Sequence, residues 1–330
     1  MKKGIFFIAL SFVLFLSGCT DEKPKDEGDN NKAAVYTTVY PLQYFTERIG
    51  AEFVDVKTIY PPGSDEHTFE PSQKDMIQLA DSDLFIFIGL GLEGFVEKAK
   101  ETLKNENVKM VPAGENIEFV HPEENHDPAH EEEGDADSHA DGDEHEEEDH
   151  DDHNHGDIDP HVWLDPVYSK ELAETIKNAL VEKMPEHEGQ LEKNYQELVK
   201  ELDDLHNAFE QTVQNAKHKE IIVSHSAYGY WEERYGLDQI SVSGLNSSSE
   251  PTQKELQKII AEAKEHDLKY VFFEQNVSSR LTEILQKEIG AEPLMLHNLS
   301  VLTEEDIQKN ETYFTLMKKN LASLEKALYE

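Results

Sequence analysis

The chain has 330 residues, of which 70 are Asp or Glu and 30 are Lys or Arg, so its formal net charge at pH 7 is -40. A surface this acidic repels phosphate backbones and attracts cations, which disfavours nucleic-acid binding. Cys19 is the only cysteine, so an intramolecular disulfide and a thiolate metal site are both excluded. Any metal site must therefore be built from histidine and carboxylate.

The first residues are typical of an exported protein. Two lysines precede an uncharged apolar run from Ile5 to Leu16, and small residues follow it, so residues 1–18 are predicted to be a signal peptide. The apolar run has about a dozen residues, whereas a membrane-spanning helix needs about 20. The letters LSGC at 16–19 resemble a bacterial lipobox, which implies a lipid on Cys19. A free cysteine in an ordinary signal peptide is the alternative.

Residues 19–32 are polar and have almost nothing to bury, so they predict a flexible tether between the lipid and the folded part. About 300 residues then remain, more than a typical single core, which indicates two domains.

Short β-branched and aromatic runs alternate with amphipathic stretches in two series, a pattern typical of α/β layers with mostly parallel sheets. We expect two similar lobes, each a sheet flanked by helices. The N-terminal lobe, residues 33–185, has predicted strands at 34–40, 53–59 and 84–88, and the C-terminal lobe, residues 216–330, has them at 220–223, 240–242, 270–273 and 294–296.

Between the lobes, apolar residues recur every three or four positions from Leu191 to Val213 without an intervening Gly or Pro. This spacing predicts one long rigid helix at 186–215, with Pro185 in its first turn. About 30 residues at 1.5 Å each give about 45 Å, enough to run along both lobes. Two shorter helices within one domain are the alternative.

Residues 121–157 form a histidine-rich, acidic insert with eighteen Asp or Glu and no Lys or Arg. Eight of the sixteen histidines of the chain lie in it: His121, His126, His130, His139, His145, His150, His153 and His155. With so few apolar residues the segment is predicted to be disordered. Imidazole and carboxylate bind transition metals, so we expect a loop that collects several ions weakly. The alternative is a solvating linker, for which Asp and Glu alone would suffice.

Four further candidates occur where a predicted strand ends or a loop turns. They are His67 in the loop at 61–71, His161 in the segment at 159–166, His225 after the strand at 220–223, and Glu274 after the strand at 270–273. Ligands of open parallel sheets bind beyond the carboxyl ends of the strands, where His225 and Glu274 stand. A carboxylate at the end of a buried strand is costly unless it is paired or binds a metal. Two residues from each lobe would hold an ion in the cleft between them.

These features together resemble a known family. They are the lipobox, the loop PPGSDEHTFEP at 61–71, the acidic histidine-rich insert, the segment DPHVWLDP at 159–166, the segment SHSAYGY at 224–230 and the long helix. The chain resembles the ZnuA and AdcA type of zinc-binding lipoprotein, the solute-binding component of metal-uptake ABC transporters. The resemblance implies two α/β lobes joined by one long helix, with the metal held between them by His67, His161, His225 and Glu274. Glu66 departs from the family pattern, which frequently has a proline before the first histidine.

Three imidazoles and one carboxylate suit four-coordinate Zn²⁺, whereas manganese prefers more oxygen ligands. The manganese relatives resemble this frame but place a carboxylate where His225 stands. The resemblance thus implies a monomeric, extracytoplasmic zinc carrier, anchored to the cell membrane by a lipid on Cys19 and partnered by an ABC permease. The alternatives are a manganese carrier, a zinc hydrolase with Glu274 or Glu66 as general base, and an adhesin. We expect no enzyme, since the sequence has no His-Glu-x-x-His pair.

Overall fold

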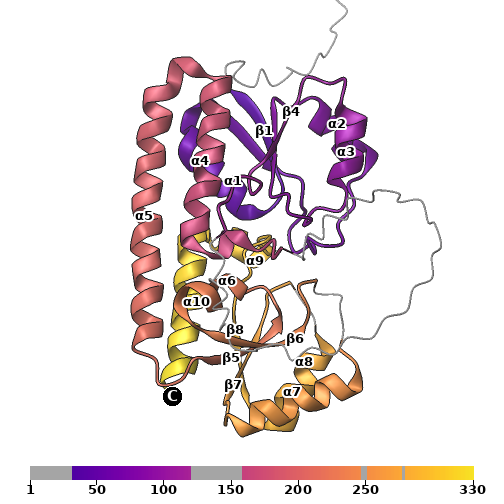
Figure 1. Cartoon of the computed structure of the whole chain (residues 1–330). Helices are drawn as coiled ribbons and strands as arrows, with labels where there is room; N and C mark the ends of the chain where they lie inside the picture. Colours follow the sequence, from indigo (N-terminus) through magenta and orange to yellow (C-terminus); the bar gives the residue numbers. More distant parts are fainter. Residues whose placement is uncertain (1–31, 120–157, 247–250, 277–278) are drawn as a thin grey trace, which may run out of the picture.

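The computed structural model describes residues 32–119, 158–246, 251–276 and 279–330 (Figure 1). The signal peptide, Cys19 and the insert with its eight histidines lie outside these ranges, as does nearly all of the tether. What the sequence predicts for them stays a prediction. Within the described ranges, none of the helices combines the length and the apolar character that crossing a bilayer requires.

The N-terminal lobe is built on a parallel four-stranded sheet with the order β2-β1-β3-β4. Its strands are β1 (Ala33–Thr37), β2 (Val54–Thr58), β3 (Leu84–Phe87) and β4 (Lys109–Pro112). Its helices are α1 (Tyr40–Gly50), α2 (Gln73–Ala80) and α3 (Val96–Leu103). All four residues of β3 are apolar and buried, as expected for a central parallel strand that is covered on both faces.

The C-terminal lobe has a second parallel sheet with the order β6-β5-β7-β8. Its strands are β5 (Glu220–His225), β6 (Asp238–Ser243), β7 (Tyr270–Phe273) and β8 (Glu292–Met295). Its helices are α6 (Gly229–Tyr235), α7 (Gln253–Glu265), α8 (Arg280–Ile289) and α9 (Glu304–Gln308). Counted from the first strand of each lobe, the two sheets have the same order. The predicted fold of two α/β lobes is confirmed.

One long helix lies alongside both lobes (Figure 1). It is α5 (Glu188–Gln214), with 27 residues, or about 40 Å, and a 3₁₀ turn at Pro185–His187 precedes it. Helices α4 (Pro166–Lys183) and α10 (Tyr313–Tyr329) pack against it. The prediction of a single helix, rather than two shorter ones, is confirmed.

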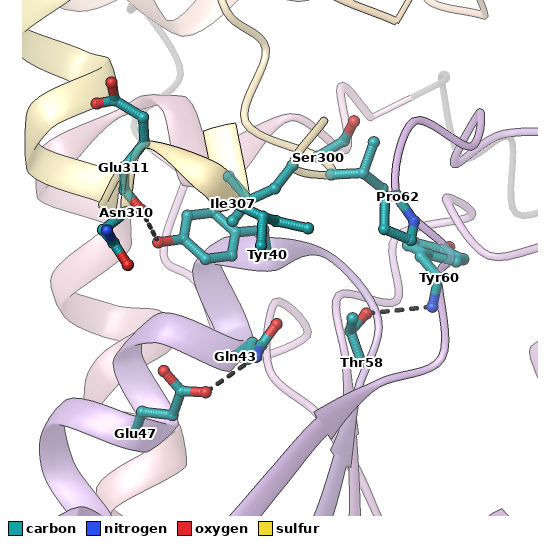
Figure 2. Close-up of a pocket in the computed structure, with 12 residues that line it drawn as sticks. Tyr40, Gln43, Glu47, Thr58, Tyr60, Pro62, Ser300, Ile307, Asn310 and Glu311 are labelled. Atoms are coloured by element: carbon teal, nitrogen blue, oxygen red, sulfur yellow. Dashed lines mark hydrogen bonds between the residues drawn. The ribbon is translucent and has the colours of Figure 1, made fainter. Parts of the chain in front are cut away.

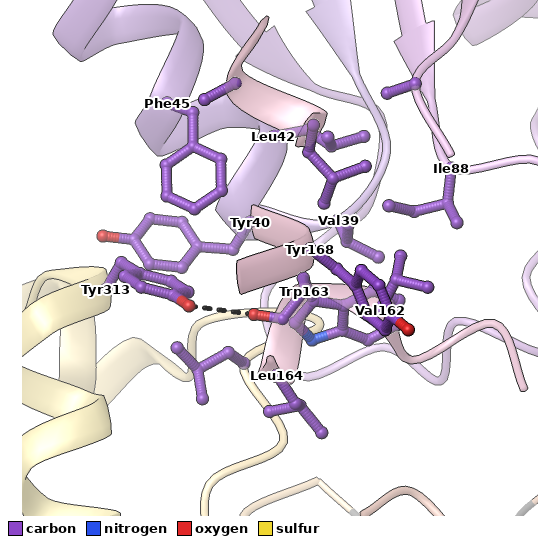
Figure 3. Close-up of a cluster of buried hydrophobic side chains, with 14 of the residues drawn as sticks. Val39, Tyr40, Leu42, Phe45, Ile88, Val162, Trp163, Leu164, Tyr168 and Tyr313 are labelled. Carbon is purple, nitrogen blue, oxygen red and sulfur yellow. Dashed lines mark hydrogen bonds between the residues drawn. The ribbon is translucent and has the colours of Figure 1, made fainter. Parts of the chain in front are cut away.

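The hydrophobic core continues from one lobe into the other. Tyr313 of α10 packs edge-on against Phe45 of α1, with ring centroids 4.9 Å apart, and its hydroxyl donates to the carbonyl of Trp163 at 2.9 Å (Figure 3). The indole of Trp231, on α6, donates to the carbonyl of Leu164 at 2.8 Å. Because these aromatic side chains are buried and their polar atoms are paired, the lobes share a firmly packed boundary.

A pocket of about 390 Å³ lies at this boundary, between α1 and the segment that carries α9 (Figure 2). Tyr40, Tyr60 and Ile307 line it together with the carboxylates of Glu47 and Glu311. None of the four candidate metal ligands lines this pocket. It is therefore separate from the site described below.

Glu93 is a buried carboxylate at the carboxyl ends of β1 and β3. It accepts hydrogen bonds from the hydroxyl of Thr38 at 2.7 Å and from the backbone N–H groups of Ile88 and Gly89 at 2.8 and 2.9 Å. Burial raises the pKa of Glu93 to about 7, although these hydrogen bonds act in the opposite direction. The side chain ties the ends of the two central strands together.

This pKa predicts a pH-dependent contribution to stability. Between about pH 4.5 and 7, Glu93 holds a proton in the folded state that it lacks in the unfolded state, so the free energy of unfolding decreases as pH rises, by up to roughly 1.4 kcal/mol per unit. Chemical denaturation of the protein and of Glu93→Gln across pH 5 to 8 measures this. We expect the stability of the wild type relative to the variant to fall over the interval. A constant difference would show that the three donors keep the carboxylate ionised.

Candidate metal centre

Three imidazoles meet at the boundary of the two lobes. The Nε2 atom of His161 lies 3.3 Å from Nε2 of His67 and 3.4 Å from Nε2 of His225. The three potential ligand atoms all lie within 4.8 Å of one another. Among the described residues this is the one group of three or more His, Cys, Asp or Glu side chains so arranged.

Each histidine reaches this point from a different element. His67 lies in the loop that follows β2, His161 directly precedes the 3₁₀ turn Val162–Leu164, and His225 is the last residue of β5. The side chains of His161 and His225 are fully buried, whereas His67 is partly exposed. β5 lies between β6 and β7, so His225 stands at the carboxyl edge of the sheet, where the strand order reverses. Ligands usually bind at this position in open parallel sheets.

Two carboxylates fix the orientation of the two buried rings. Nδ1 of His161 lies 2.7 Å from Oδ1 of Asp159, and Nδ1 of His225 lies 2.6 Å from Oε1 of Glu274. An ionised carboxylate only accepts hydrogen bonds, so each Nδ1 carries the proton and each Nε2 presents a lone pair. Pairs of this kind between a carboxylate and an imidazole commonly orient metal-binding histidines.

The spacing of the Nε2 atoms fits a tetrahedral zinc ion. With Zn–N distances of about 2.0–2.1 Å, neighbouring nitrogens of a tetrahedron lie about 3.3–3.4 Å apart, and the two separations centred on His161 are 3.3 and 3.4 Å. Lone pairs that face one another at this distance repel unless a cation lies between them. The arrangement is thus complementary to a small, borderline-soft cation.

Glu274 occupies a different position from the one implied by the family resemblance. Its Oε1 contacts the outer nitrogen of His225, and its Oε2 accepts a hydrogen bond from Nδ2 of Asn298 at 2.8 Å. It does not belong to the group of converging ligand atoms. The structure therefore brings together three of the four predicted ligands and places the fourth behind one of them.

Glu66, the residue before His67, is a second buried carboxylate near the site, with 2% of its surface exposed. Its oxygens face amide donors of Asn276 at 3.3 Å and of Asn298 at 3.5 Å. Burial raises the pKa of Glu66 above its ordinary value. Both asparagines belong to the C-terminal lobe, so the loop bearing His67 is held across the lobe boundary.

The pKa values of His67 and His225 are shifted in opposite directions because their surroundings differ. Burial, with smaller contributions from His161 and His225, lowers the pKa of His67 to about 4. Burial alone would lower the pKa of His225 as well, but the adjacent Glu274 outweighs it and the net shift is upward. Metal binding requires neutral imidazole, so the lowered pKa of His67 favours metal binding, whereas the raised pKa of His225 makes protons stronger competitors for its ring.

Asp159 and Asn298 have roles that the sequence alone does not reveal. Asp159 stands two residues before His161 and bonds both its ring and its backbone N–H, and the spacing Asp-Pro-His is the one local signal for it. Asn298 lies 24 residues beyond Glu274, and nothing in the sequence around it indicates their contact.

The chain was compared with known protein families and structures. A family model described as ZnuA, the periplasmic component A of a zinc-uptake complex, matches residues 35–327. The chain belongs to this family. It is 33% identical over 327 residues to the high-affinity zinc uptake system protein ZnuA of Bacillus subtilis, a match that covers 98% of the chain and 97% of that protein.

Another relative, AdcA, is longer than this chain. The zinc-binding lipoprotein AdcA of Streptococcus pneumoniae is 33% identical over 324 residues, covering 98% of this chain but 60% of AdcA. The crystal structure of the Zn(II)-bound ZnuA-like domain of that AdcA superposes with a TM-score of 0.71 at 29% identity, covering 91% of this chain and all of that domain. The fold described above is thus the fold of a structure solved with zinc.

We predict that His161→Ala or His225→Ala weakens zinc binding by more than about 100-fold, because each removes a ligand of the ion. Loss of a group that only hydrogen-bonds a ligand costs roughly 10–100-fold. Competitive titration with a chelator measures the affinity, and circular dichroism checks the fold. His206→Ala is the matched control, since that imidazole contacts the hydroxyl of Tyr235 outside the cluster. Tight binding that survives in both site variants would contradict the assignment.

Proposed function

We propose that this protein captures Zn²⁺ outside the cytoplasm and delivers it to the membrane permease of an ABC importer. The observation that carries the proposal is the convergence of three imidazoles: Nε2 of His161 lies 3.3 and 3.4 Å from the other two Nε2 atoms, and the rings of His161 and His225 are backed by carboxylates. Membership of the ZnuA family supports it, as do the relatives named for zinc uptake and zinc binding.

In this proposal His67, His161 and His225 bind the ion directly, and Glu274 holds the ring of His225. The ion that binds here is cargo, and it must both bind tightly and leave. A third imidazole favours zinc over manganese, because manganese prefers more oxygen ligands and a higher coordination number. Native mass spectrometry of the mature protein with equimolar Zn²⁺ and Mn²⁺ tests the choice. We expect zinc alone in the tight site, and preferential loading of manganese would contradict it.

Two parts of the proposal, export and attachment to the membrane, rest on the sequence. The predicted signal peptide at 1–18 supports export, and the lipobox supports a lipid on Cys19 that keeps the folded part at the cell membrane. The relative AdcA is itself named a lipoprotein. We propose a monomeric carrier whose partners are the bilayer, through this lipid, and the permease.

The histidine-rich insert is proposed to collect metal for the tight site. Its imidazoles and carboxylates are ligands for divalent transition metals. Its composition predicts disorder, so each site in it would have to be organised from an unfolded chain. Binding there is therefore weak and multiple.

We predict that deleting residues 121–157 preserves the tight zinc site and abolishes additional weak ones, because all three imidazoles of the cluster lie outside the insert. Isothermal calorimetry resolves the two classes of site. A second variant, in which only the eight histidines of the insert become Asn, separates the effect of imidazole from that of charge. Loss of the tight site on deletion would mean that the insert supplies a ligand.

Catalysis is the competing function, because a zinc ion with three histidines and an open position also occurs in hydrolases and hydratases. The full burial of His161 and His225 favours storage of an ion over access for a substrate. We propose that the protein is not an enzyme.

The variant Glu274→Gln distinguishes carrier from enzyme. In a carrier it weakens zinc binding roughly 10–100-fold, because the partner of His225 is altered, and neither wild type nor variant shows zinc-dependent esterase or carbonic-hydratase turnover. An enzyme with Glu274 as general base would lose activity with little change in zinc affinity. A steady-state assay beside a chelator titration, on both proteins, measures the two quantities. Robust turnover by the wild type that vanishes in the variant would refute the carrier.

A further inference from the structure

Asn298 is a fully buried residue in the turn between β8 and α9. The next residue, Leu299, is also fully buried and has a φ of +61°, a conformation that is uncommon for a residue with a branched side chain. Such a backbone persists where the surrounding contacts determine it, and it occurs preferentially at functional sites. The contacts of Asn298, the residue directly before Leu299, therefore indicate its role.

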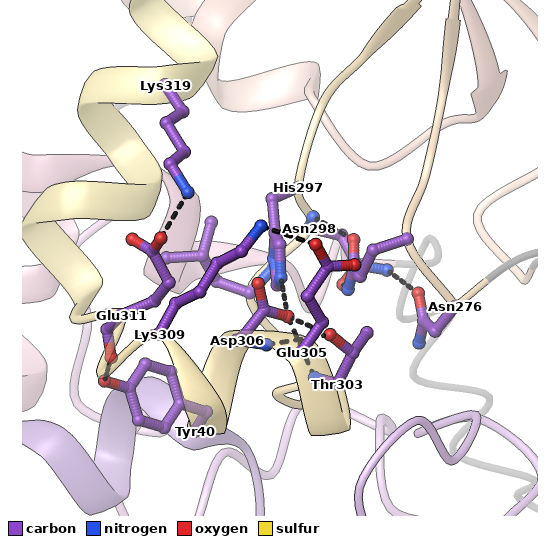
Figure 4. A network of polar contacts seen from close by, with 12 residues as sticks. Tyr40, Asn276, His297, Asn298, Thr303, Glu305, Asp306, Lys309, Glu311 and Lys319 are labelled. Atoms are coloured by element: carbon purple, nitrogen blue, oxygen red, sulfur yellow. Dashed lines mark hydrogen bonds and ion pairs between the residues drawn. The ribbon is translucent and has the colours of Figure 1, made fainter.

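The amide of Asn298 has a defined orientation. Its Oδ1 accepts from the backbone N–H of Ser300 at 3.1 Å and from Nε2 of Gln275 at 2.7 Å. Its Nδ2 donates to Oε2 of Glu274 at 2.8 Å and faces Oδ1 of Asn276 at 3.1 Å. A backbone N–H can only donate and an ionised carboxylate can only accept, so the two ends of the amide cannot be exchanged. Figure 4 shows Asn298 beside Asn276, one of these partners.

Asn298 is linked to all three imidazoles through intervening residues. Its side chain bonds Glu274, which holds His225. The same Nδ2 lies 3.5 Å from Oε1 of Glu66, whose neighbour in the chain is His67. On the main chain, its carbonyl accepts the indole N–H of Trp163 at 2.7 Å, and Trp163 follows His161 by two residues. One residue of the C-terminal lobe thus contacts both lobes beside the metal site.

We propose that Asn298 is a positioning residue for the metal centre, acting on the bound ion through Glu274 and His225. This inference rests on the proposed function as a zinc carrier. The amide fixes Oε2 of Glu274, so that Oε1 stays on Nδ1 of His225 and the lone pair of Nε2 points at the ion. Without this donor the carboxylate can turn away from the ring, and the ring loses its partner. Outer partners of metal-binding histidines have effects of this kind.

The experiment compares zinc affinity and zinc dissociation rate in the full chain purified in detergent. The variants are Asn298→Ala, Asn298→Ser, Glu274→Gln, and Glu274→Gln combined with each change at 298. Serine keeps a small hydroxyl that can accept from the nearby N–H of Ser300, yet is too short to reach Glu274. The matched control is Asn194→Ala. Asn194 lies in the first two turns of α5, and its side-chain amide donates a partly buried hydrogen bond to the carbonyl of Ile49 at 2.9 Å.

We expect both single variants at 298 to bind zinc about tenfold more weakly than wild type, at the lower end of the range for outer partners. Because the effect passes through Glu274, the changes at 298 should cause little further loss of zinc affinity in the Glu274→Gln background. A residue with a purely structural role would instead cause its full loss of affinity in that background. Co²⁺ in place of zinc should show an altered visible absorption band in the 298 variants. The control should keep the wild-type affinity and band.

The outcomes separate this inference from the proposed function. A wild type without a tight zinc site would refute both. If the wild type binds zinc tightly and the 298 variants bind it equally tightly, only the positioning role is refuted. The same holds if the loss of affinity at 298 adds fully to the loss caused by Glu274→Gln. Failure of both 298 variants to fold would also overturn it, since Asn298 would then determine the fold and not the metal centre.

Discussion

Two imidazoles are held in the interior of this protein with no solvent to satisfy them, and the rest of the site follows from that constraint. Each ring needs an acceptor on Nδ1, because a buried polar group without a partner is costly. Asp159 and Glu274 supply these acceptors at 2.7 and 2.6 Å. Once both outer nitrogens are satisfied, the inner ones have only lone pairs to offer, and these converge with that of His67. The cation is favoured because the buried nitrogens are otherwise directed against one another.

The two lobes serve this arrangement by bringing carboxyl ends of strands to a common boundary. His225 ends β5 and Glu274 follows β7, the central strands of one sheet, while His67 and His161 come from connections of the other lobe. A continuous aromatic core, with Tyr313 of α10 packed on Phe45 of α1, keeps the halves in register. The precision of a site assembled from four separate segments therefore depends on packing that lies well away from it.

Much of this was predictable from the sequence, and the reasons differ from residue to residue. The long apolar repeat from Leu191 to Val213 is not interrupted by Gly or Pro, so α5 could be predicted within two residues at each end. The first strand was predicted to reach 40 but ends at Thr37, because Tyr40-Pro41 starts α1, a position that suits proline. The short strand β4 (Lys109–Pro112) has only four residues and ends in proline, so the sequence does not distinguish it from a loop.

The same contrast holds for the site, where residue type indicates a ligand but not its neighbours. Three histidines could be chosen from their places beside strands and turns. The contact between Glu274 and the outer nitrogen of His225, rather than with the ion, depends on side-chain directions that spacing does not encode. The approach of Asn298 to both lobes arises only when the chain is folded. The partial exposure of His67 is likewise visible only in the folded chain, and it concerns the rates at which an ion enters and leaves the site. His67 is the partly exposed imidazole of the cluster, and its loop is fastened to the opposite lobe by hydrogen bonds from Gly63 to Leu302 and from Asn276 to Ser64. If an ion passes on this side, these hydrogen bonds raise the barrier to entry and the barrier to exit by the same amount, so they lengthen the lifetime of the complex without changing its affinity.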